Sequence, residues 1–368
     1  MMLTSAQESD RREPFSSNSN QNEAMTIKDA RGKRAESAIL TGTKESSEDG
    51  SFAHQKKPKR IIFNSRSVIH SVAFLDDGKH VISGGREGKI RRWRMEDGRE
   101  VGTPMNAGST VYSIAVSPDE KWIVSGTIHG QVAVWNAEMH SKVKEWEAHY
   151  VEVRAVDVSS DGTRTATGSN DSTLCVWSLS TGELLLGPLE HVTGREVVAA
   201  KFSPNGRLIA TATWHDVRVY DSQNGGLLLE FPVLVSSTLN ESLAWASNSK
   251  QLFALSRDGI IHCLDVSTGM MLSRWAIHSS KDPRCIALAS NGTFIAVTAN
   301  SSVSFWDTAT HQQIGSVIKH NGNILSMAIS TKYDLVSGGN QTITIRGLWD
   351  ILPYHYLHNV CVCVKKLK

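Results

Sequence analysis

The chain has 368 residues with 39 Lys and Arg against 37 Asp and Glu, so its net charge is only +2. A charge this small excludes a general affinity for nucleic acid or for an anionic membrane surface. The composition, 40% hydrophobic and 21% charged, is that of a globular protein, without an apolar stretch of about 18 residues that would span a bilayer. Five cysteines and no secretory signal pattern predict reduced thiols inside the cell.

Residues 1–58 are predicted to form a disordered N-terminal arm. They are rich in Ser, Asn, Glu and Lys, poor in aromatic residues, and show neither the period of a strand nor that of a helix. At the end of the arm, Lys56, Lys57, Lys59 and Arg60 form a basic run of the kind that serves as a nuclear import signal. The predicted location is therefore cytoplasmic, with entry into the nucleus as the open alternative.

A repeat follows the arm. Trp93, Trp135 and Trp177 are spaced 42 residues apart, and each ends an alternating segment of strand character. The pattern continues with steps of 40 to 44 residues to the equivalent positions Tyr220, Leu264, Trp306 and Arg346. A turn sequence rich in Asp, Asn, Ser and Gly recurs ahead of each of these strands, as at Ser159–Gly162. Two markers in the same phase indicate seven structural repeats.

Each repeat supplies four short strands, which in the third repeat are predicted at residues 153–158, 164–168, 174–177 and 184–188. Four strands per repeat of this length are typical of a propeller blade, and blades bury both of their faces only within a closed ring. The chain is therefore predicted to be all-β. It is expected to form a seven-bladed β-propeller of four-stranded antiparallel blades over residues 59–350, followed by a short C-terminal tail at 351–368.

The last repeat lacks a convincing fourth strand, since Pro353 follows closely behind its third strand. The segment Arg60–Phe63 precedes the first repeat, where a fourth strand stands in every other repeat. We expect this segment to complete the final blade and to cover a sheet edge that would otherwise be open to aggregation.

The repeats resemble those of the WD-repeat family. In that family a His before the first strand, a Ser or Thr in the second, an Asp in the next turn and a Trp in the third form a buried hydrogen-bond network. The third repeat carries this set as His149, Ser169, Asp171 and Trp177. The set is eroded in the other repeats, which the resemblance implies are held less rigidly.

Two motifs have the residue types of active sites but a better structural interpretation. His149, Ser169 and Asp171 could form a catalytic triad, yet their spacing fits the buried network that the resemblance implies. Gly84–Lys89 is similar to a phosphate-binding loop, but it lacks the first glycine and the Ser or Thr after the lysine. Neither motif predicts catalysis.

The C-terminal tail contains His355, His358, Cys361 and Cys363, residue types that bind zinc. The Cys-x-Cys pair is closer than the usual zinc spacing, and a disordered tail is the preferred interpretation. We therefore expect no enzyme activity, no cofactor and no metal site.

The resemblance also implies where partners dock. In the family this is the narrower top face, through two positions per blade, one near the start of the first strand and one before the turn Asp. The implied partner-binding residues are His70, Arg86, Tyr112, Ile128, Arg154, Val198, Glu241, Arg257, Arg284 and Leu325. Nearby carboxylates, such as Glu152 and Glu196, balance the arginines, which predicts a mixed polar rim suited to a peptide.

The leading hypothesis is a non-catalytic scaffold or adaptor that binds partner proteins or peptides within a larger complex, without direct contact to nucleic acid or membrane. A chromatin- or RNA-associated complex subunit is the alternative, supported by the basic run. A propeller enzyme is the third possibility, but the rim offers His70 without a matched acid.

Overall fold

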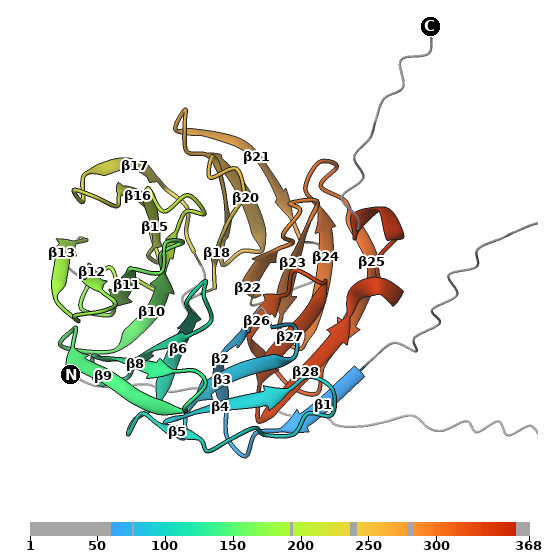
Figure 1. The fold of residues 1–368 in the computed structure, drawn as a ribbon. Helices are drawn as coiled ribbons and strands as arrows, with labels where there is room; N and C mark the ends of the chain where they lie inside the picture. The colour runs from blue at the N-terminus through green and yellow to red at the C-terminus, as the bar shows by residue number, and fades with distance from the viewer. Residues whose placement is uncertain (1–59, 76, 192–193, 236–240, 278–282, 358–368) are drawn as a thin grey trace, which may run out of the picture. The chain divides into compact units, whose positions relative to one another are not determined.

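The computed structural model describes residues 60–75, 77–191, 194–235, 241–277 and 283–357. Within these residues, seven four-stranded antiparallel sheets surround a common centre (Figure 1), which confirms the predicted propeller. The predicted arm and the lysines of its basic run lie outside the described residues. No helix in the described part of the chain is long and apolar enough to cross a membrane.

Each of the first six blades is built from four consecutive strands, ordered from the channel to the circumference. Blade 1 contains β2 (Ile69–Phe74), β3 (His80–Gly85), β4 (Lys89–Arg94) and β5 (Met105–Asn106). Blade 2 contains β6 (Val111–Val116), β7 (Trp122–Thr127), β8 (Gln131–Asn136) and β9 (Ser141–Glu147). Blade 3 contains β10 (Val153–Val158), β11 (Arg164–Ser169), β12 (Thr173–Ser178) and β13 (Leu184–Glu190). The strands predicted for the third repeat are thus confirmed to within two residues at each end.

The next three blades repeat this plan. Blade 4 contains β14 (Ala199–Phe202), β15 (Leu208–Ala212), β16 (Val217–Asp221) and β17 (Leu227–Phe231). Blade 5 contains β18 (Leu243–Trp245), β19 (Gln251–Leu255), β20 (Ile260–Asp265) and β21 (Met270–Ala276). Blade 6 contains β22 (Pro283–Leu288), β23 (Phe294–Ala299), β24 (Ser302–Asp307) and β25 (Gln313–Lys319).

Blade 7 joins the two ends of the propeller. Its inner strands are β26 (Ile324–Ile329), β27 (Asp334–Gly339) and β28 (Thr342–Gly347), and its outer strand is β1 (Arg60–Asn64). β1 pairs antiparallel with β28, with Ile62 opposite Thr344. The expected closure by the N-terminal segment is confirmed. Phe63 also contacts Trp93 of blade 1, with ring centroids 4.9 Å apart, so this strand attaches the last blade to the first.

Burial follows the position of each strand in its blade. All six residues of β23 are buried, whereas five of the seven residues of the outer strand β9 are exposed. The middle strands carry apolar side chains on both faces because a neighbouring blade covers each face. The core is therefore a series of apolar layers between blades.

Serine hydroxyls join neighbouring blades beside the channel. The Oγ atom of Ser326 accepts the amide of Val72 (2.8 Å), that of Ser71 accepts Ile114, and that of Ser113 accepts Val156. These serines occupy the same position in blades 7, 1 and 2, so each bond ties one inner strand to the next. Buried amides at this position are thereby satisfied.

The prediction of a disordered C-terminal tail is corrected in part. A disordered tail was expected from Ile351, but residues 351–357 pack against blade 6 and include the 3₁₀-helix η2 (Tyr354–Tyr356). Leu352 and Leu357 are buried there, and the carbonyl of Tyr356 accepts a hydrogen bond from Asn291 Nδ2 (2.8 Å). A second 3₁₀-helix, η1 (Leu348–Asp350), connects β28 to this segment. The two buried leucines stand five residues apart with Pro353 between them, so neither a strand nor a helix period marks this segment in the sequence.

Removal of β1 tests the closure. Deletion of residues 1–66 removes the outer strand of blade 7 and the Phe63–Trp93 contact, and we expect a loss of roughly 3–6 kcal/mol of unfolding free energy. That is a large part of the 5–15 kcal/mol that typically stabilises a domain, so aggregation on heating is expected. Deletion of residues 1–55 is the control, with thermal unfolding close to that of the full chain. Equal melting temperatures for both truncations would contradict closure by β1.

Candidate functional site

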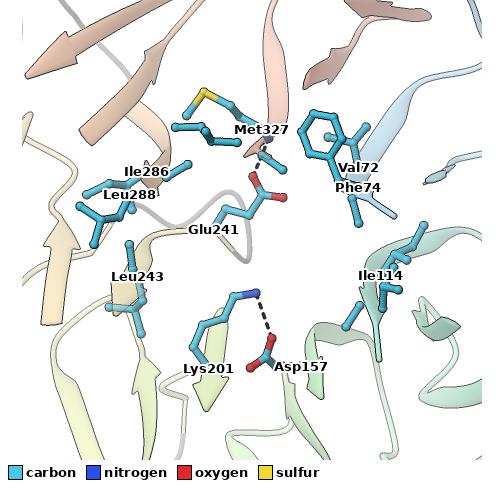
Figure 2. A pocket seen from close by; sticks show the side chains of 17 residues that line it. Val72, Phe74, Ile114, Asp157, Lys201, Glu241, Leu243, Ile286, Leu288 and Met327 are labelled. Carbon is cyan, nitrogen blue, oxygen red and sulfur yellow. Dashed lines mark hydrogen bonds and ion pairs between the residues drawn. The ribbon is translucent and has the colours of Figure 1, made fainter. Parts of the chain in front are cut away.

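The inner strands enclose a channel with a cavity of about 390 Å³ (Figure 2). Most of its wall is apolar, but one side carries Asp157, Lys201 and Glu241, from blades 3, 4 and 5. The Nζ atom of Lys201 lies 3.3 Å from Asp157 Oδ1, and Asp157 Oδ2 accepts the amide of Phe202 (2.8 Å). These charges therefore take part in bonds between blades, a role that the sequence analysis missed for Lys201 and Asp157.

Glu241 was expected on the rim, and the structure places it in the channel instead. Its Oε2 atom accepts the amide of Met327 in blade 7 (2.6 Å), and its Oε1 atom is bonded to the hydroxyl of Ser326. Its backbone carbonyl accepts the amide of Ile286 in blade 6 (2.8 Å). Burial raises the pKa of Glu241 to about 7, although these hydrogen bonds oppose the shift. Glu241 thus links three blades and is not a partner-binding residue of the open rim.

The top face, which carries the turns between second and third strands such as that at Arg86–Gly88, gathers an aromatic and cationic cluster on blades 1–3. The rings of His70 and Tyr112 lie 5.1 Å apart, and the guanidinium of Arg154 lies 4.8 Å above the Tyr112 ring. Arg86 is exposed beside them. Burial first, and then the charges of Arg154 and Arg86, lower the pKa of His70 to about 4. His70 is therefore neutral at neutral pH, and the arginines carry the charge of this cluster.

The other implied rim residues are spread over the ring. Arg257 is exposed, whereas Ile128, Arg284 and Leu325 are partly buried. The prediction for Val198 is corrected, because its exposed fraction is 0% and it belongs to the apolar layer between blades 4 and 5. The alternating pattern does not distinguish a valine on the rim from a valine in the core, because both fit it. Only the packing shows that Val198 is buried.

The polar network of blade 3 exists, but its hydroxyl is that of Thr167. His149 Nδ1 lies 2.9 Å from Asp171 Oδ2, and His149 Nε2 lies 2.7 Å from Thr167 Oγ1. Trp177 Nε1 donates to the same Thr167 oxygen (2.9 Å). Ser169, expected in this place, instead accepts the amide of Asp171 (3.1 Å). The network uses both nitrogens of the histidine inside the blade, which suits structural support rather than attack on a substrate.

The correct hydroxyl had a signal in the sequence. Trp93 Nε1 donates to Ser83 Oγ (2.7 Å) and Trp135 Nε1 to Ser125 Oγ (2.9 Å). In each case, as for Thr167, the hydroxyl residue stands ten positions before the tryptophan. Two middle strands joined by a tight turn fix this spacing. Trp93 is directly opposite Val81, so Ser83 lies on the same face of the strand pair, two residues along the strand.

Hydrogen bonds also hold the carboxylate of this network in its charged form. Burial alone would raise the pKa of Asp171, but the bonds from His149 and Thr173 outweigh burial and lower the pKa to about 2. Asp171 is therefore ionised throughout the neutral range.

Replacement of Thr167 by Val tests its place in the network. Because this change leaves the Trp177 indole and His149 without their shared partner, we expect a loss of about 1–3 kcal/mol of unfolding free energy. Ser169→Ala removes the acceptor of one amide and should cost about 1 kcal/mol. Urea denaturation measures both. A larger loss for Ser169→Ala would contradict the assignment.

Glu241 predicts a pH dependence of stability. Its folded pKa lies above the ordinary value of 4.5, so the unfolded chain releases a proton that the folded chain keeps, and stability falls as the pH rises from about 4.5 to about 7. Glu241→Gln should remove about 1–3 kcal/mol of this fall. Comparison of variant and parent at each pH separates Glu241 from the histidines. The exposed Glu138→Gln serves as control, and parallel stability curves for Glu241→Gln and parent would refute the assignment.

Comparisons with known proteins agree with this geometry. Residues 56–94, 99–136, 140–178 and 185–221 match the repeat described as WD domain, G-beta repeat. The small ribosomal subunit protein RACK1y of Oryza sativa subsp. japonica is 30% identical over 126 residues, 33% of this chain and 37% of the relative. The small ribosomal subunit protein RACK1 of Caenorhabditis elegans is 30% identical over 128 residues, 32% of this chain and 38% of the relative.

Each of these alignments spans less than two fifths of the relative. The repeat matches run from β1 through blades 1–3 to the third strand of blade 4, and they include the tryptophan–hydroxyl bonds of blades 1–3. Together with the seven four-stranded blades, they show that the chain belongs to the WD40-repeat β-propeller family.

Proposed function

We propose that this propeller is a non-catalytic scaffold or adaptor whose top face binds peptide segments of partner proteins. The observation that carries the proposal is the cluster of His70, Tyr112 and Arg154 beside the exposed Arg86. Tyrosine and arginine are enriched at the centres of protein interfaces, since each combines a large contact area with hydrogen-bonding groups. Stacking fixes Tyr112 before a partner arrives, which lowers the entropy cost of binding.

Two further observations support a binding role over catalysis. The WD40 family is mostly non-catalytic. Glu241 in the channel and Asp171 in blade 3 have strongly shifted pKa values, and both are engaged in hydrogen bonds between structural elements. Both oxygens of each of these carboxyl groups take part in hydrogen bonds within the fold, which suits structural support better than general acid or base catalysis.

The relatives favour one kind of assembly. Both are named as small ribosomal subunit proteins, so we include the ribosome among the complexes that this chain would join in the cytoplasm. Co-sedimentation of the full chain with purified small ribosomal subunits tests this second candidate. A chain that stays at the top of the gradient would exclude it and leave the peptide scaffold.

A double variant tests the top face. Arg86→Ala combined with Tyr112→Ala should reduce capture of the principal partner at least tenfold, as expected for about 1.4 kcal/mol or more of lost binding energy. The melting temperature should change by only a few degrees, because both side chains lie at the surface of the fold. Quantitative mass spectrometry of proteins captured by the tagged full chain measures the effect.

The matched control removes a cation and a large exposed side chain from the opposite face. Arg99→Ala combined with Met139→Ala alters turns between third and fourth strands, and Met139 is well exposed. This control should keep the partners that the top-face variant loses. Loss of the same partners from both variants, or from neither, would place the docking surface elsewhere.

A further inference from the structure

A cleft between the outer parts of blades 2 and 3 lies apart from the top-face cluster. Its volume is about 550 Å³. Blade 2 contributes Glu147 at the end of β9, and blade 3 contributes Trp177 from β12 with Leu184, Pro188 and Glu190 from β13. β9 and β13 are the outermost strands of their blades (Figure 1). Residues of both strands line the cleft, which places it toward the circumference of the propeller.

Tyr150 stands at this cleft with a fixed backbone and an exposed ring. The backbone around Tyr150 is fixed, since the amides of Ala148 and His149 donate to the carbonyl of Gly130 at 2.9 and 3.0 Å. Asp171 lies 3.4 Å from the Tyr150 amide. The Tyr150 residue is nevertheless 98% exposed. A large amphipathic side chain on a fixed backbone is well suited to contact a partner at little entropy cost.

Apolar side chains form the rest of the wall. Leu184 is 44% exposed, and the Trp177 ring behind it packs against Trp146 with centroids 5.9 Å apart. Pro188 is exposed where the register of β12 and β13 is broken. Gly187, which has φ of +103°, allows that break. The cleft therefore offers exposed apolar surface of β13 beside Trp177.

The charge of the cleft has one sign. Glu147 and Glu190 are exposed, and neither side chain has an ion-pair or hydrogen-bond partner among the residues that the structure describes. Glu145, on the same strand as Glu147, is by contrast paired with Lys142 at 2.6 Å. Asp171 adds a third carboxylate, and no described lysine or arginine lines the cleft. The resulting field attracts a cation.

We propose that this cleft binds a segment of a partner protein in which a lysine or arginine is flanked by apolar residues. The cationic group binds between Glu147 and Glu190, where charge-assisted hydrogen bonds replace its water. The apolar neighbours pack on Leu184, Pro188 and Tyr150. The cleft has the opposite charge to the cluster of Arg86 and Arg154, so the two sites select different segments, and neither proposal depends on the other.

Methyl NMR on the full chain provides the test. The probe is a synthetic peptide of sequence GLKLKG with blocked ends, and the methyl groups of Ala148, Thr173 and Leu184 report on the cleft. We expect saturable shifts of these methyl groups that weaken with added salt. The peptide GLELEG should cause no such shifts. No saturable shift with the basic peptide, or equal shifts with the acidic one, would overturn the proposal.

Charge-neutralising variants make the test specific. Glu147→Gln combined with Glu190→Gln should weaken binding of the basic peptide roughly tenfold, the effect of losing one charge-assisted hydrogen bond. Glu145→Gln combined with Glu183→Gln removes the same charge from neighbouring positions outside the cleft and should change binding less than about twofold. The top-face variant should bind the peptide like the parent. Equal weakening in both glutamate variants, or loss in the top-face variant, would also overturn the proposal.

Discussion

Closure of the ring is the constraint on which the rest of the structure depends. A blade with two apolar faces is stable only between two neighbours, so every interface between blades must form together. β1 supplies the last strand of blade 7 and, through Phe63 on Trp93, its contact with blade 1. Near the channel, hydroxyls of blades 7, 1 and 2 bond the next inner strand, and Asp157 does the same from blade 3 to Phe202 of blade 4. Serine and aspartate side chains thus both accept a hydrogen bond from an amide of the neighbouring blade.

The two halves of the ring meet this constraint by different means. Blades 1–4 carry the recognisable repeats, and tryptophan–hydroxyl bonds stiffen the first three. Beyond residue 221 the repeat signature fades, and other groups take part in holding the ring. Glu241 joins blades 5, 6 and 7, and Leu352 and Leu357 of the C-terminal segment bury apolar surface against blade 6. Sequence drift in these blades is therefore accompanied by bonds and packing that do not follow the repeat.

Periodicity was enough to predict what the ring requires of every blade. Strand positions recur in every repeat. The register of one repeat therefore also gives the number of blades and the strand that closes the ring. Features that occur once were not accessible in this way. Nothing in an alternating strand distinguishes the buried Val198 from a rim residue, and the turn of Glu241 into the channel depends on partners 85 residues away. The resemblance assigned the hydroxyl of the network to Ser169, although the constant spacing of hydroxyl and tryptophan points to Thr167.

The same polar network connects stability with the surfaces available for binding. Asp171 bonds His149 inside blade 3 and also lies beside the amide of Tyr150, so the group that fixes the blade also orders the segment that projects Tyr150 to solvent. β10, which follows this segment, carries Arg154 to its place over Tyr112 on the top face. Blade 3 thus contributes to both surfaces, with Arg154 in the cationic cluster and Asp171 in the acidic cleft. Rigid support of this kind lowers the entropy cost of binding at both surfaces, because the backbone that carries each aromatic anchor is already fixed.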